Sequence, residues 1–91
     1  MDKKFIVKRK GHREHFDERK AYGSIYFACR SSHLSETEAE KLSNKVAIEL
    51  KAYLADKKSA NSSEIFEFIG YHLTQLNSDA GYMYKTHRDI S

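Results

Sequence analysis

Two helix-start signals divide the C-terminal two thirds of this 91-residue chain. Each is a capping box, in which a Ser or Asn side chain can accept a hydrogen bond from the backbone three residues on, where a Glu stands: Ser35-Glu36-Thr37-Glu38 and Asn61-Ser62-Ser63-Glu64. Apolar side chains follow each box at helical spacing, at Ala39, Leu42, Val46, Leu50 and Tyr53, and at Ile65, Phe68, Ile69, His72, Leu73 and Leu76. We therefore predict two amphipathic helices, one ending near residues 56–58 and the other before Asn77.

Two more helices are predicted on either side of these. Asp17 is a candidate N-cap for a first helix that runs to about Arg30, where Ser31-Ser32-His33 breaks the pattern. Asn77-Ser78-Asp79 begins a short last helix that continues through Ile90.

The N-terminal segment is predicted to form a β-hairpin. If Lys10 and Gly11 make a two-residue turn, Arg9 faces His12, Val7 faces Glu14 and Phe5 faces Phe16. A lone hairpin is marginal in water, so this one must lean on the helices. The predicted fold class is α+β and mainly α: a small hairpin or sheet cap over a four-helix bundle, as one domain over residues 1–91.

Positive charge is concentrated at one end of the chain, which carries +3 overall. Residues 1–20 are net +4 and the rest net −1, which suits an anion site, although a solvated basic strand pair is the ordinary explanation. One Cys allows no internal disulfide and no Cys-rich zinc site, and the chain has neither a membrane-span run nor a signal-peptide core. We therefore expect a cytoplasmic protein with no membrane segment.

Catalytic and metal-binding patterns are weak. There is no phosphate loop of the G-x-x-x-x-G-K-[ST] type and no nucleophile triad, so no enzymatic activity is expected. His12 and His15, three apart on a predicted strand, would point to opposite faces and chelate poorly, so no metal site is expected either.

The chain resembles the ATP-cone family in an ordered set of short motifs. They are Val7-Lys8-Arg9-Lys10-Gly11, Glu14-His15-Phe16-Asp17, Lys20, Leu34-Ser35-Glu36, Asn61-Ser62-Ser63-Glu64-Ile65 and Ala80-Gly81-Tyr82-Met83-Tyr84-Lys85. The resemblance implies an adenine-nucleotide-binding regulatory domain in which ATP or dATP binds with magnesium between a strand cap and the helices. Lys10 departs from the family by standing where an aspartate is common.

The resemblance also implies partners. Such domains usually stand at the N-terminus of ribonucleotide reductases or in a zinc-ribbon transcriptional repressor of their genes. This chain has no reductase domain and no Cys-x-x-Cys ribbon, so a reductase or transcription regulator acting in trans, or a homo-oligomer, is expected to be the effector. The chain also stops soon after Arg88, so we expect it to lack contacts that the longer final helices of other family members make.

A triphosphate site needs cations at one end and an apolar slot with polar edges at the other. Lys8 and Arg9 supply the cations, and Arg can grip two phosphate oxygens at once. Backbone N–H groups at the start of the first helix would add partial positive charge. Acidic side chains suit the ribose or the adenine amino group. The predicted nucleotide-binding residues are Val7, Lys8, Arg9, Gly11, Glu14, Phe16, Asp17, Lys20, Ser62, Phe66, His87 and Arg88.

Each of these residues also has an ordinary explanation. Glu14 and Lys20 could form a surface pair, and His87 and Arg88 could belong to a solvated helix tail. A second function from the same basic segment is a small nucleic-acid-binding protein, although the chain contains no recognised nucleic-acid motif.

Overall fold

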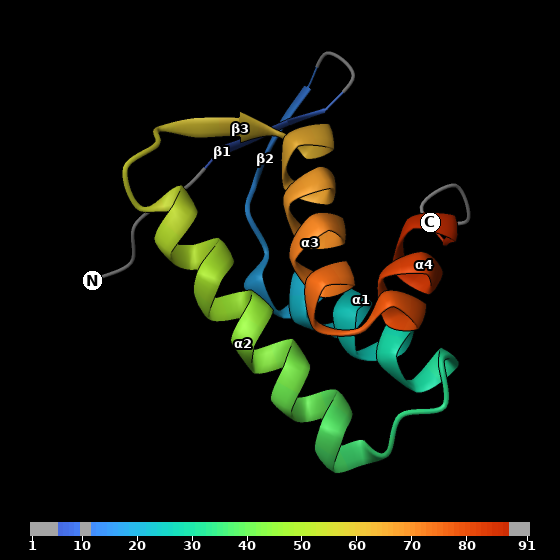
Figure 1. Ribbon diagram of the computed structural model, residues 1–91. Coiled ribbons are helices and arrows are strands. Elements are labelled where there is room, and N and C mark those ends of the chain that lie inside the picture. The colour runs from blue at the N-terminus through green and yellow to red at the C-terminus, as the bar shows by residue number, and fades with distance from the viewer. Residues whose placement is uncertain (1–5, 10–11, 88–91) are drawn as a thin grey trace.

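The computed structural model describes residues 6–9 and 12–87, with only the backbone described for residues 6–9 and 12–15. The elements, in chain order, are β1 (Ile6–Arg9), β2 (His12–His15), α1 (Glu18–Ser31), α2 (Glu36–Leu54), β3 (Ser59–Asn61), α3 (Ser62–Leu76) and α4 (Ser78–Thr86). Figure 1 shows how they are arranged. The prediction of a mainly helical chain is confirmed.

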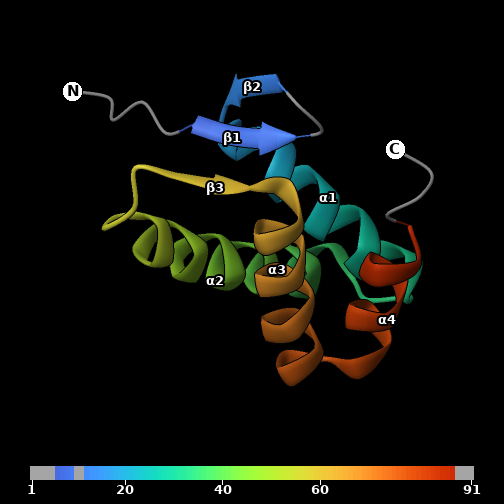
Figure 2. The same ribbon diagram turned by 90° about the horizontal axis from the view of Figure 1, so that it is seen from above.

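The strands pair in the order β2-β1-β3. β1 and β2 are antiparallel, and Arg9 lies opposite His12 and Val7 opposite Glu14, the pairs predicted from the sequence. Phe5, Lys10 and Gly11, on which the rest of that prediction depends, lie outside the described residues. Figure 2 shows β3 running above α2, with β1 and then β2 on its other side.

The sequence did not predict β3. It pairs in parallel with β1, so that Lys8 lies opposite Asn61, and it leads directly into α3. Three residues are too few for alternation to be recognised, and the partner strand is about fifty residues away in the sequence.

The predicted starts of all four described helices are confirmed by their N-caps. The capping oxygens accept from backbone N–H groups two or three residues on: Asp17 from Arg19 and Lys20, Ser35 from Glu38, Asn61 from Glu64 and Asn77 from Ala80. Each bond satisfies an N–H that has no partner within the helix.

The helix ends differ more from the prediction than the starts do. α1 ends at Ser31, and His33 then adopts a φ of 74°, a left-handed conformation that turns the chain toward α2. α2 ends at Leu54, slightly before the predicted residues 56–58. α4 ends at Thr86, whose hydroxyl bonds to the Met83 carbonyl, so the prediction that it continues to Ile90 is wrong at His87, which caps the helix.

The core is made where the helices meet, and most of it follows the predicted stripes. The buried apolar residues are Ile25, Ala28, Cys29, Ala39, Val46, Leu50, Leu54, Ala60, Ile65, Ile69, Leu73 and Ala80. Burial raises the pKa of the Cys29 thiol, which keeps it in its unreactive protonated form at neutral pH. Among the described helices, none is both long enough and apolar enough to cross a bilayer.

α3 and α4 approach each other closely at Gly81. A Cβ at this position would lie 2.0 Å from Thr74 Oγ1 and 2.6 Å from Thr74 Cα. The Thr74 hydroxyl is itself held by a 2.6 Å hydrogen bond to the Gly70 carbonyl oxygen. The absence of a side chain at Gly81 therefore sets how α4 lies against α3.

Gly81→Ala should destabilise the fold by about 1–3 kcal/mol, because the added methyl group overlaps the Thr74 backbone. Gly23→Ala is the matched control: nothing lies within 4 Å of its Cβ position in α1, so the change should stabilise by up to about 1 kcal/mol. Urea denaturation of both variants measures the difference. Equal stability of the Gly81→Ala variant and the wild type would contradict this packing.

Candidate functional site

The β1–β3 pairing brings candidate residues from distant parts of the sequence together. Lys8 lies opposite Asn61, which is both the last residue of β3 and the N-cap of α3. Ser62, the first residue of α3, follows at once, and Arg9 is the next residue of β1. The backbone therefore places the predicted phosphate-binding segment beside the first turn of α3.

Some of the predicted site falls outside what the structure describes. Gly11 and Arg88 are not among the described residues, and the side chains of Val7, Lys8, Arg9 and Glu14 are not described either. For these four residues only the register is known, in which Val7 lies between Glu14 on β2 and Ala60 on β3.

The junction between β2 and α1 holds two further candidates. Phe16 and Asp17, with Glu18 and Arg19, line an open hollow of about 460 Å³. Phe16 packs against the core, whereas Asp17 is exposed and uses Oδ1 to accept from the N–H groups of Arg19 (3.0 Å) and Lys20 (3.2 Å). The start of α1 is therefore already capped by a carboxylate, which weakens the positive potential that we expected it to offer to a phosphate.

Lys20 is exposed in the first turn of α1. Its assignment to a shared site rests on its i, i+3 spacing from Asp17.

The predicted site residues Phe66 on α3 and His87 at the C-cap of α4 both make aromatic contacts. Phe66 stacks on Tyr84 with ring centres 5.1 Å apart, and His87 meets the edge of Phe27 at the same separation. The buried His87 Nε2 has no hydrogen-bond partner among the described residues, and an unpaired buried nitrogen is a group that a ligand can satisfy. Of these four residues, the sequence prediction included Phe66 and His87 but neither Tyr84 nor Phe27.

The sequence analysis also missed two residues that contact the first turn of α3. Glu64 Oε2 accepts from Tyr53 Oη and from Lys57 Nζ, the latter at 2.9 Å. The Tyr53 hydroxyl and then the Lys57 ammonium hold the pKa of Glu64 below its ordinary value. A carboxyl whose pKa is lowered by folding contributes stability above its unfolded value of about 4.3, and this contribution is lost as the pH falls through the folded value.

The described residues contain no cluster of three or more His, Cys, Asp or Glu side chains that could hold a metal ion.

Comparison with known proteins gives a family and two relatives. Residues 4–84 match the family described as the ATP cone domain. The chain is 30% identical over 89 residues to the transcriptional repressor NrdR of Sorangium cellulosum, covering 93% of this chain and 57% of that protein. It is 32% identical over 90 residues to the NrdR repressor of Kosmotoga olearia, covering 94% of this chain and 56% of that one.

The chain thus spans somewhat more than half the length of the curated relatives that it matches. No solved structure matches it.

Asp17→Ala should destabilise the fold by about 0.5–2 kcal/mol, because two N–H groups of α1 lose their acceptor. Asp17→Asn should stay within a few tenths of a kcal/mol of the wild type, since Asn caps about as well as Asp. Thermal unfolding at neutral pH compares the two. A loss in Asp17→Asn as large as in Asp17→Ala would mean that the charge of Asp17, and not the cap, stabilises α1.

Proposed function

Because this chain belongs to the ATP-cone family of nucleotide-binding regulatory domains, we propose that residues 1–91 act as one such domain that binds ATP or dATP with magnesium. The observation that carries the proposal is the β1–β3 register, in which Lys8 lies opposite the N-cap of α3. This register brings the basic strand and the start of α3 to one place.

In the proposed site the strands form a cap and the four helices a bundle beneath it. Lys8 and Arg9 bind the phosphates, and Gly11, which follows them in the sequence, is assigned to the same end of the site. Ser62 at the start of α3 and His87, the C-cap of α4, complete the phosphate end, and Arg88, the next residue in the sequence, is assigned to it as well. Two facts support this assignment: the unpaired Nε2 of His87 and the net charge of +4 in residues 1–20.

The base and ribose would lie against the apolar part of the same site. The half-buried rings of Phe16 and Phe66 offer apolar surface, and Val7 is assigned to the same part of the site. Glu14, Asp17 and Lys20 are assigned to the polar edges of the ribose and adenine. Bound magnesium would neutralise part of the triphosphate charge, which lowers the number of protein cations required.

The proposed output is regulatory and not catalytic. Nucleotide binding changes how the helices pack, and through this the tendency of the domain to self-associate or to dock on a partner in trans, such as a ribonucleotide reductase or a transcription regulator. Both relatives are named as transcriptional repressors, which supports an output in gene regulation. We place this function in the cytoplasm, as expected from the sequence.

A ligand panel tests the nucleotide assignment. ATP or dATP at a hundredfold excess over its Kd should stabilise the fold by about 2.7 kcal/mol, because ligand that binds only the folded state shifts unfolding by mass action. GTP and inorganic triphosphate should raise the melting temperature less. Equal shifts for all four would reduce the site to a general anion patch, and a larger shift with a DNA duplex would favour the nucleic-acid alternative.

The double variant Lys8→Ala/Arg9→Ala should weaken ATP binding by at least about tenfold, since each lost charge-assisted hydrogen bond costs about 1.5–3 kcal/mol. The control is Lys41→Ala/Lys45→Ala, which removes the same charge from two exposed positions on α2. Calorimetric titration of both variants with ATP provides the comparison. Unchanged affinity in the β1 variant, or an equal loss in the control, would contradict the proposed site.

A further inference from the structure

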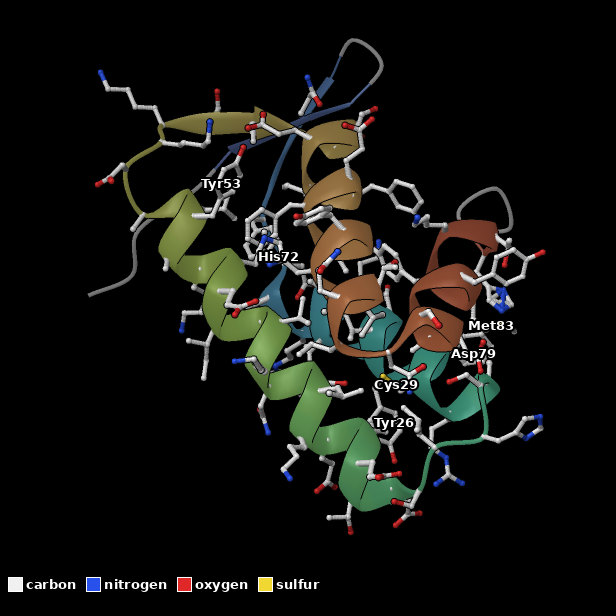
Figure 3. The ribbon with its side chains drawn as sticks, in the orientation of Figure 1. Tyr26, Cys29, Tyr53, His72, Asp79 and Met83 are labelled. Atoms are coloured by element: carbon white, nitrogen blue, oxygen red, sulfur yellow. The ribbon has the colours of Figure 1, made fainter. Side chains whose placement is uncertain are left out.

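α2 and α3 meet along a regular seam of paired side chains. Moving from its upper end, Lys57 pairs with Glu64, Tyr53 with Phe68, and Glu49 with His72. Lys57 follows the end of α2, whereas Tyr53 and Glu49 lie in the helix one turn apart, and Glu64, Phe68 and His72 follow one another at one turn of α3. In Figure 3, Tyr53 and His72 lie one above the other between the two helices.

The contacts along this seam are continuous. The Tyr53 ring stacks on Phe68 at 4.5 Å between ring centres, and Phe68 lies 4.1 Å from the His72 ring. His72 Nδ1 is 3.2 Å from Glu49 Oε1. The seam therefore follows α3 from Glu64 to His72, about two turns, and joins it to α2 and to the segment just after α2.

The upper end of the seam is a compact cluster of Tyr53, Lys57 and Glu64, which we call the clamp. Both Tyr53 and Lys57 donate to the same oxygen, Glu64 Oε2, and Lys57 Nζ also lies 4.9 Å from the centre of the Tyr53 ring. A cation above an aromatic face is attracted by the electron density of the ring. Each of the three side chains thus contacts the other two.

Glu64 is held at both its backbone and its carboxylate. Its N–H donates to Asn61 Oδ1 at 2.8 Å, while its carboxylate reaches the end of α2. Asn61 in turn lies opposite Lys8. The clamp therefore connects the end of α2 to the turn of α3 that follows the Lys8–Asn61 pair.

The clamp adds little to the burial that holds α3 in the fold. The side chains of Lys57 and Glu64 are 34% and 30% exposed, and ion pairs as open as this contribute little net stability. Ile65, Ile69 and Leu73, on the neighbouring stripe of α3, already make its core contacts. The clamp contacts the first turn of α3 beside that core stripe.

We infer that the clamp is a positioning device: through Glu64, Tyr53 and Lys57 hold the first turn of α3 beside β1 in the arrangement that binds the nucleotide. This inference rests on the proposed function and names three residues outside the predicted nucleotide-binding set. Tyr53 and Lys57 act through Glu64 and are positioning residues that need not touch the ligand.

Affinity and stability must be measured separately to test this inference. Tyr53→Phe removes the hydroxyl and keeps the ring stacked on Phe68, while Lys57→Met removes the charge and keeps the chain length. Both variants should bind ATP at least about fivefold more weakly, a typical coupling between connected sites. Lys57→Arg, which can still donate to Glu64, should restore most of the affinity.

Two controls separate positioning from loss of stability. Ser35→Ala removes the N-cap at the far end of α2 and lowers the melting temperature, but should leave the Kd for ATP unchanged. Tyr82→Phe removes a hydroxyl from an exposed tyrosine on α4 and should change neither. All titrations are made well below every melting temperature.

Hydrogen exchange at the Glu64 amide provides a second readout. It should be faster in Tyr53→Phe and Lys57→Met than in Ser35→Ala, because its bond to Asn61 is then less well fixed. If the wild type binds ATP and both clamp variants bind it equally well, or if Ser35→Ala loses as much affinity, the inference is overturned. Failure of the wild type to bind ATP would instead reject the proposed function, on which the inference depends.

Discussion

The parallel pairing of β1 with β3 is the contact on which the site depends. Strands that run in parallel cannot be joined by a tight turn, and here the connection contains α1 and α2. The chain must therefore pass through these two helices between Lys8 and Asn61. The three residue pairs between β1 and β3 thus fix the position of the basic strand relative to the helices.

α3 lies at the centre of this arrangement because different stripes of the helix have different roles. Ile65, Ile69 and Leu73 enter the core, Phe66 stacks on α4, and Glu64, Phe68 and His72 face α2. A displacement of its first turn would change its contacts with α2. It would also move α4, because the close contact at Gly81 fixes α4 to α3. This geometry offers a physical route by which a ligand near β1 could alter the surfaces of α2 and α4.

Local signals in the sequence were sufficient to predict the helix starts. Asp17, Ser35, Asn61 and Asn77 each cap the helix predicted for them, because capping depends on a few neighbouring residues. The pairing of β1 with β2 could also be predicted, because the two strands are neighbours in the sequence. β3 was missed because its stability comes from a partner distant in sequence. The end of α4 at Thr86 was misplaced because no Gly or Pro follows it to mark the end of the helix.

The site could be predicted less completely than the fold. Residue type and order pointed to Lys8, Arg9 and Ser62, and the register brings their backbones together. The contacts of Tyr53 and Lys57 with Glu64, and of His87 with Phe27, depend on which elements lie side by side, which residue spacing alone does not give. A four-residue spacing at Glu49, Tyr53 and Lys57 and again at Glu64, Phe68 and His72 is a signal of the seam that can be recognised only when the two helices are known to be antiparallel neighbours.

The central claim is that β1 and the first turn of α3 share one purine triphosphate. The most direct test is a titration of isotope-labelled protein with ATP, followed by the backbone amide resonances of the whole chain. Our account predicts that the amides of Lys8 and Arg9 and those of residues 62–66 shift together with a single Kd. Shifts confined to only one of these segments, or two segments that saturate at different concentrations, would contradict it.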